Sequence, residues 1–100
     1  MARYKLTQKA VDDLSQIWRY TYERWSENQA DKYYQLLIDS FDELAGNPGL
    51  GKSYSGVIVD LFGLRSGRHI IFYRKIEEGE IEIIRILHEQ MDIKNRTKEK

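Results

Sequence analysis

Two dense apolar runs in the C-terminal half constrain the fold of this 100-residue chain more than any other feature. They cover residues 69–74 and 81–88, and the short segment 77–80 between them is polar and contains a glycine. Apolar runs joined by so short a polar connection are typical of a β-hairpin. A two-residue turn at Glu78-Gly79 predicts four cross-strand pairs, namely Lys75–Glu82, Tyr73–Ile84, Ile71–Ile86 and His69–His88.

A second turn at Ser66-Gly67 adds a preceding strand, with Phe62 opposite Ile71 and Leu61 opposite Phe72. Side chains alternate across a strand, so both faces of this meander are expected to be apolar. One face carries Phe62, Leu64, His69, Ile71, Tyr73, Ile84, Ile86 and His88, and the other carries Leu61, Ile70, Phe72, Ile76, Ile81, Ile83 and Leu87 together with Arg65, Arg68, Arg74 and Arg85. Both faces must be covered, one by the chain itself and the other by a partner.

Two amphipathic helices are expected before the meander. Thr7 is a candidate N-cap, followed at helical spacing by Val11, Leu14, Trp18, Tyr22 and Trp25. Ser26 and Gln29 have capping-box spacing, followed by the stripe Ala30, Tyr33, Leu37, Phe41 and Leu44, which Gly46 and Pro48 end. With a short strand over 3–7 in front, the predicted fold is α+β, in the order β-α-α-β-β-β. An antiparallel helical hairpin packs on one face of an antiparallel sheet.

Composition and charge predict one small domain. The 16 basic and 16 acidic residues give a formal net charge of zero, which argues against nucleic acid binding driven by an overall positive charge. The absence of cysteine excludes disulfides and thiolate metal sites, and no apolar run suggests a membrane span or a signal peptide. We expect a domain over residues 1–93, a charged disordered tail over 94–100, and a cytoplasmic location.

Three patterns suggest chemistry but have a simpler structural interpretation. Segment 47–53 ends in Gly-Lys-Ser, but it follows a helix, which is the wrong context for a phosphate-binding loop. His69 and His88 could bind a metal or transfer a proton with help from Glu89 or Asp92, whereas a polar cluster at the end of the sheet needs no third group. The helix aromatics could stack nucleobases, but their spacing is more typical of a core.

The arginines among aliphatic side chains favour a protein-binding surface over a solvated face. Arginine pairs with carboxylates, while the aliphatic residues offer apolar contact area. The predicted partner-binding residues are Leu61, Arg65, Arg68, Ile70, Phe72, Arg74, Arg85 and Leu87.

The chain also resembles a known family, the ParE toxins of the ParE/RelE toxin-antitoxin superfamily. The resemblance runs from about Leu6 to Asp92. The residues that carry it are Asp13-Leu14, Gln29-Ala30, Phe41, Leu44-Ala45, Asn47-Pro48-Gly49, Gly67, His69–Arg74, Arg85–His88 and Met91-Asp92. The family fold is a helical hairpin packed on an antiparallel sheet, which agrees with the order derived from the residues.

The resemblance implies a plasmid-stabilisation type of toxin that inhibits DNA gyrase, blocks replication and is neutralised by a ParD-type antitoxin. It implies no cofactor, no metal, no catalytic residue and no sequence-specific nucleic acid binding. The antitoxin's C-terminal segment would fold across the arginine-bearing face, its carboxylates meeting Arg65, Arg74 and Arg85.

The alternative is the activity of RelE relatives, which cut messenger RNA in the ribosome. The strand position that aligns with a RelE catalytic arginine is Ile70 here, and no tyrosine follows Tyr73. His88 could act as an acid or base, with Arg85 expected on the opposite face. A third possibility is a toxin fold that has lost its activity and only binds its partner.

Overall fold

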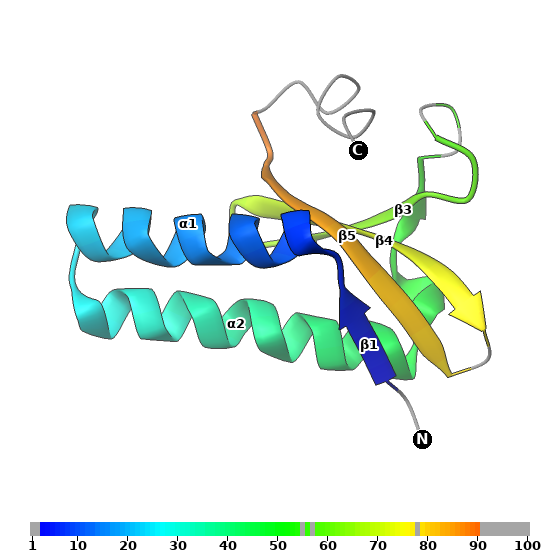
Figure 1. Ribbon diagram of the computed structural model, residues 1–100, viewed down its shortest axis with the longest axis horizontal. Coiled ribbons are helices and arrows are strands. Elements are labelled where there is room, and N and C mark those ends of the chain that lie inside the picture. The colour runs from blue at the N-terminus through cyan, green and yellow to red at the C-terminus, as the bar shows by residue number, and fades with distance from the viewer. Residues whose placement is uncertain (1–2, 55, 57, 78, 91–100) are drawn as a thin grey trace.

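The computed structural model describes residues 3–54, 56, 58–77 and 79–90, and these form the predicted order of elements with two short additions (Figure 1). The elements are β1 (Arg3–Leu6), α1 (Gln8–Arg24), α2 (Glu27–Gly46), the 3-10 turn η1 (Pro48–Leu50), β2 (Lys52–Ser53), β3 (Phe62–Ser66), β4 (His69–Glu77) and β5 (Glu80–His88). The α+β class is confirmed. The tail predicted over 94–100 lies outside the described residues.

Both helices begin at the residues that the sequence indicates. The Thr7 hydroxyl accepts a hydrogen bond from the Ala10 amide, and the Ser26 hydroxyl accepts one from the Gln29 amide, each at 3.1 Å. These side chains satisfy amides that have no partner inside the first helical turn. Neither helix, nor any other helix of the described residues, is long and apolar enough to cross a membrane.

The sheet has five strands in the order β1-β5-β4-β3-β2 and is mixed. The meander β3-β4-β5 is antiparallel as predicted, but β1 runs parallel to β5, with Arg3 opposite Glu80 and Leu6 opposite Ile83. The prediction of a wholly antiparallel sheet is therefore wrong at this edge. Hairpin turns force antiparallel pairing, whereas β1 and β5 are separated by every other element and no turn dictates their direction.

The β4-β5 register agrees with the prediction at one end only. His69–His88 and Ile71–Ile86 pair as expected, but Tyr73 lies opposite Ile83. The register shifts between Phe72 and Tyr73 and again between Lys75 and Glu77, so the predicted Tyr73–Ile84 and Lys75–Glu82 pairs are wrong. Each shift leaves one residue without a cross-strand partner, as in a β-bulge. The strand that carries the extra residue then presents its following side chains to the opposite face.

The β3-β4 connection turns one residue later than predicted, at Gly67-Arg68, with Ser66 paired to His69. Phe62 therefore lies opposite Tyr73 rather than Ile71. Gly67 adopts a φ of 60°, the left-handed conformation that glycine tolerates best. Because the register differs from the prediction by two residues, every side chain of β3 keeps its predicted face.

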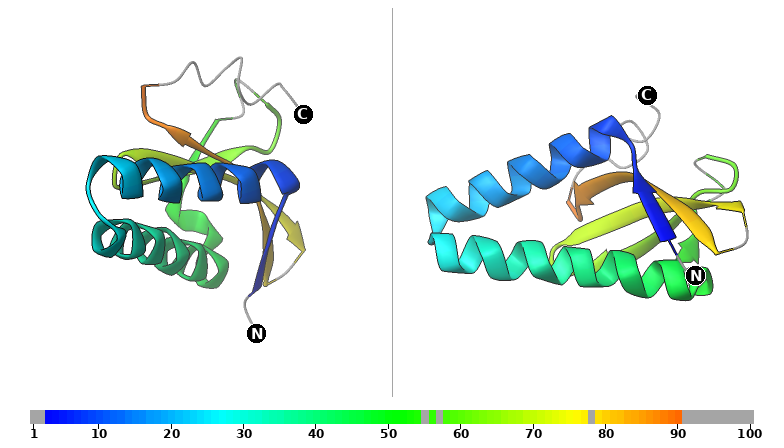
Figure 2. Two further views of the ribbon diagram at one scale, coloured as in Figure 1. Left: turned by 60° about the vertical axis from the view of Figure 1, so that its left-hand side comes forward. Right: turned by 60° about the horizontal axis from the view of Figure 1, so that its bottom comes forward.

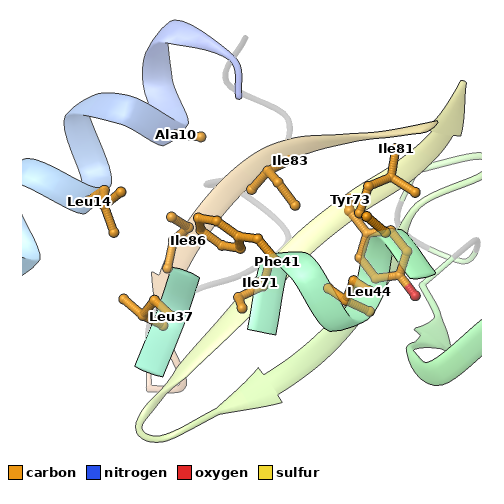
Figure 3. Close-up of a cluster of buried hydrophobic side chains, with 11 residues drawn as sticks. Ala10, Leu14, Leu37, Phe41, Leu44, Ile71, Tyr73, Ile81, Ile83 and Ile86 are labelled. Carbon is orange, nitrogen blue, oxygen red and sulfur yellow. The ribbon is translucent and has the colours of Figure 1, made fainter. Parts of the chain in front are cut away.

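The helices cover one face of the sheet, as predicted, and form the main core with it (Figure 3). Helix residues of this core are Ala10, Leu14, Leu37, Phe41, Leu44 and Ala45, and strand residues are Ile71, Tyr73, Ile81, Ile83 and Ile86. The bulge near Phe72 explains two corrections, because Ile81 and Ile83 were predicted on the other face. Together these residues bury a continuous apolar layer between hairpin and sheet.

The connected ends of α1 and α2 extend past the sheet, away from β1 and the β4-β5 turn (Figures 1 and 2). Aromatic residues near this end are exposed, with Trp25 at 73% and Tyr22 and Tyr34 also at the surface. The prediction that they belong to the core is wrong. The sheet does not reach far enough along the helices to cover them, and α1 contributes Ala10 and Leu14 to the core instead.

Candidate functional site

The second face of the sheet carries a compact apolar cluster beside Arg65, Arg68 and Arg74. We call the cluster and these three arginines together the arginine-bearing face. The cluster consists of Leu61, Ile70, Phe72, Ile84 and Leu87. Four of these are predicted partner-binding residues, and the structure brings them together. Ile84 was missed because the bulge that turns it to this face comes from a local irregularity, which period-two alternation does not contain.

This cluster is already covered by the chain, so the prediction of an unshielded second face is wrong. Its five residues are all buried, with Ile70 the most accessible at 9% together with Ile84. Tyr54 and Ile58, from the segment between β2 and β3, pack against them, and the Tyr54 ring meets Phe72 edge-on at 5.2 Å between centroids. The sequence of this segment has no periodicity from which its fold-back could be predicted.

Gly63 permits this cover to lie close to the sheet. A Cβ at this position would approach Tyr54 Cε1 to 2.7 Å and Ile70 Cγ2 to 3.1 Å, distances at which the Tyr54 ring would have to shift. Glycine within a strand often marks such a close approach.

Two arginines of this face are exposed and hold acidic neighbours. Arg74 Nε of β4 lies 3.0 Å from Glu82 Oε1 of the adjacent β5, and Arg65 of β3 forms an ion pair with Glu89, the residue after β5. Both guanidinium groups remain more than half exposed, so these pairs are screened by water and contribute little to stability. Arg68, in the β3-β4 turn, is also exposed. These three arginines are accessible to a partner.

Arg85 is placed differently from the prediction. Its Nε and Nη2 atoms donate to both carboxylate oxygens of Asp13 at 2.8 and 3.0 Å, and the two side chains are only 12% and 11% exposed. Asp13 also accepts a hydrogen bond from the Ile86 amide at 3.0 Å, on the edge of β5 beyond its pairing with β1. The guanidinium of Arg85 thus ties α1 to the sheet edge and already has a carboxylate partner.

A groove of about 610 Å³ lies beside Arg65. It is lined by Leu50, Lys52, Tyr54, Gly63, Leu64, Arg65, Ile70, Glu89 and Gln90. Lys52 and Arg65 give it positive charge, and Ile70, Leu64 and Tyr54 give it apolar walls. Such a groove suits a peptide that has both aliphatic and acidic side chains.

The two histidines meet as predicted, at the end of the sheet. Their rings are T-shaped at 5.4 Å between centroids, and Tyr33 Oη lies 2.7 Å from His69 Nδ1. The Tyr33 hydroxyl also accepts a hydrogen bond from the Arg68 amide at 2.9 Å and donates one to the Ser66 carbonyl at 3.4 Å. Within the described residues, no three histidine, cysteine or acidic side chains are grouped as a metal site. The geometry favours the structural interpretation of this pair.

Stability is expected to depend on the protonation of His69. Burial, and secondarily the neighbouring His88, lower the pKa of His69 from 6.5 to about 4. The unfolded chain therefore binds this proton first, so the contribution is fully present above pH 6.5 and is lost as the pH falls to about 4. Chemical denaturation between pH 7 and 4 should show this loss, and His69→Gln should reduce its slope. An NMR titration midpoint of His69 near 6.5 would contradict the assignment.

Known proteins resemble this chain in sequence over nearly its whole length. The model of the ParE toxin family, described as the ParE toxin of the type II toxin-antitoxin system parDE, matches residues 4–93. Toxin ParE1 of Mycobacterium tuberculosis strain H37Rv is 37% identical over 92% of this chain and 94% of its own length. Toxin ParE1 of Caulobacter vibrioides is 35% identical over the same shares, and Toxin ParE of Escherichia coli is 32% identical over 96% and 93%.

A solved structure shares the fold. A chain of the chromosomal ParDE toxin-antitoxin system from P. aeruginosa superposes with a TM-score of 0.73 at 25% identity, covering 88% of this chain and 96% of that one. The family match, the relatives and the shared fold lead to one conclusion: this chain belongs to the ParE toxin family of type II toxin-antitoxin systems.

Proposed function

We propose that this ParE-family toxin inhibits DNA gyrase in the cytoplasm, blocks replication without catalysing a reaction of its own, and is neutralised by a ParD-type antitoxin. The observation that carries the proposal is the family match across residues 4–93, joined by relatives named as ParE toxins. Family membership is an associational argument for the target, so a direct assay is required.

The geometry gives less support to the RelE-like alternative. Messenger RNA cleavage needs a cation free to stabilise the phosphate and an acid or base that titrates near neutral pH. Arg85 is held by Asp13 at 2.8 Å, so its charge is already engaged by a carboxylate. His88, the candidate acid or base, lines a pocket together with Arg85, and its Nδ1 accepts a hydrogen bond from the Gln90 amide at 3.1 Å.

A supercoiling assay with purified gyrase tests the proposal. Adding the toxin should inhibit supercoiling and accumulate cleaved DNA, and premixing it with its antitoxin should prevent both effects. A parallel assay should find no translation-dependent cleavage of messenger RNA. Cleavage of messenger RNA with normal supercoiling would replace this proposal by the RelE-like activity, and neither effect would indicate a fold that only binds its partner.

We place the antitoxin on the arginine-bearing face, along the groove beside β3. Arg65, which lines the groove, would meet its carboxylates together with Arg68 and Arg74 outside the groove, and Ile70 is part of the apolar wall of the groove. Leu61, Phe72 and Leu87 are buried below this surface and support it, so their part in binding is indirect. Arg85 leaves the predicted set of direct contacts, because Asp13 already neutralises its charge.

The double variant Arg65→Glu, Arg74→Glu should raise the Kd for the antitoxin at least about tenfold, because it places like charges opposite acidic side chains. Isothermal titration calorimetry measures this directly. Both side chains are exposed, so the fold should be retained. Arg19→Glu, Arg24→Glu, at two exposed arginines of α1, is the charge-matched control and should leave the Kd unchanged. Equal affinity of the double variant and the parent would refute the placement.

A further inference from the structure

The outer side of the helical hairpin has two features that neither the core nor the antitoxin site explains. We call it the outer helical face and define it by the aromatic residues Trp18, Tyr22, Trp25 and Tyr34 and the acidic residues Asp31, Asp39 and Asp42. It belongs to the layer of helices, on the opposite side of the sheet from the arginine-bearing face.

Two of the aromatic residues stack on each other, and with the exposed Trp25 they make up what we call the aromatic ridge. The Trp18 and Tyr22 rings stack at 5.3 Å with an interplanar angle of 7°, and Trp25 follows at the exposed end of the helix. Trp18 Nε1 donates to Asp31 Oδ1 at 3.0 Å, which connects the ridge of α1 to α2. Pre-ordered, solvent-exposed Trp and Tyr side chains are typical of the residues that dominate protein interfaces.

The acidic residues give this face a negative charge. Helix α2 contains five carboxylates, Glu27, Asp31, Asp39, Asp42 and Glu43, against one lysine, Lys32, so its net side-chain charge is −5 + 1 = −4. Asp31, Asp39 and Asp42 are separated by eight and three residues and therefore lie on the same side of the helix. All three are exposed, and a groove of about 510 Å³ beside Asp31 is lined by Trp18, Arg19 and Tyr34.

We infer that the outer helical face docks on a positively charged surface of the toxin's target, with the aromatic ridge as the central contact. The inference rests on the proposed function, which makes that target gyrase. An enzyme that holds DNA presents a basic surface to it, and an acidic face with aromatic anchors complements such a surface in charge and in apolar contact. The two partners of the toxin would then use opposite faces of the molecule.

The double variant Tyr22→Ala, Trp25→Ala tests the ridge. Its concentration for half-maximal inhibition of gyrase supercoiling should rise at least about tenfold, because Trp and Tyr anchors carry much of the binding energy of an interface. Its affinity for the antitoxin should stay within about twofold of the parent. Tyr20→Ala is the control: Tyr20 is 58% exposed against 49% for Tyr22 but lies about 200° around α1 from Tyr22, so both properties should be unchanged.

A charge series tests the acidic part. Asp39→Asn should weaken inhibition less than Asp39→Lys, because the first only removes the charge and the second reverses it; circular dichroism should show both variants folded. Unchanged inhibition by all variants would overturn the assignment, and so would a parallel loss of antitoxin binding, which would give this face to the antitoxin. A parent protein that does not inhibit gyrase would refute the proposed function itself, and the inference with it.

Discussion

Replacing Asp13 by alanine is expected to lower the free energy of unfolding by about 3–5 kcal/mol, the range for removing one partner of a buried ion pair. The change would remove the carboxylate partner of the Arg85 guanidinium at a site where that side chain is only 12% exposed. It would also remove the acceptor of the Ile86 amide. Urea denaturation followed by tryptophan fluorescence measures the loss.

Two further variants separate the causes of this loss. Asp13→Ala combined with Arg85→Met should recover a large part of the stability, because a buried apolar pair can replace a buried ion pair. Arg74→Ala, which breaks the exposed pair with Glu82, should change stability by less than about 1 kcal/mol. Equal effects of Asp13→Ala and Arg74→Ala would contradict the view that Arg85 is a structural cation.

Replacing Phe41 by alanine is the second large effect, also about 3–5 kcal/mol of unfolding free energy, the usual cost of deleting a buried Phe side chain. Phe41 is fully buried within the main core (Figure 3). Its ring meets Tyr4 edge-on at 5.3 Å between centroids. Its loss would open a cavity between α2, the strands and β1. Leu36→Ala, at an exposed position of the same helix, is the control and should cost much less. A small effect of Phe41→Ala would mean that the neighbouring side chains collapse into the space.

Local signals predicted the helices with good accuracy. Thr7 and Ser26 cap them as expected, and Gly46 is the last residue of α2. Capping depends on hydrogen bonds between residues three apart, so the chemistry is contained in a short segment of sequence. Which part of each helix is buried was less predictable, because the sheet's reach along the helices decides it, and Trp25 and Tyr22 extend beyond that reach.

The sheet was predictable in its order and only partly in its register. The His69–His88 and Ile71–Ile86 pairs follow from the turn length, but the bulge near Phe72 reassigns Ile81, Ile83 and Ile84 to new faces. A bulge depends on how a strand must bend to pack on the helices, and alternating hydrophobicity does not encode it when both faces are apolar.

The candidate binding surface was also predictable only in part from the sequence. Sequence alone determined that Leu61, Ile70, Phe72 and Leu87 share a face with arginines, because alternation along neighbouring strands is a local property. Only the tertiary structure decided that Tyr54 and Ile58 cover this cluster and that Arg85 is held by Asp13, 72 residues away in the chain. Contacts between such distant residues depend on how whole elements pack, and a long, flexible arginine can reach a partner on either side of its strand.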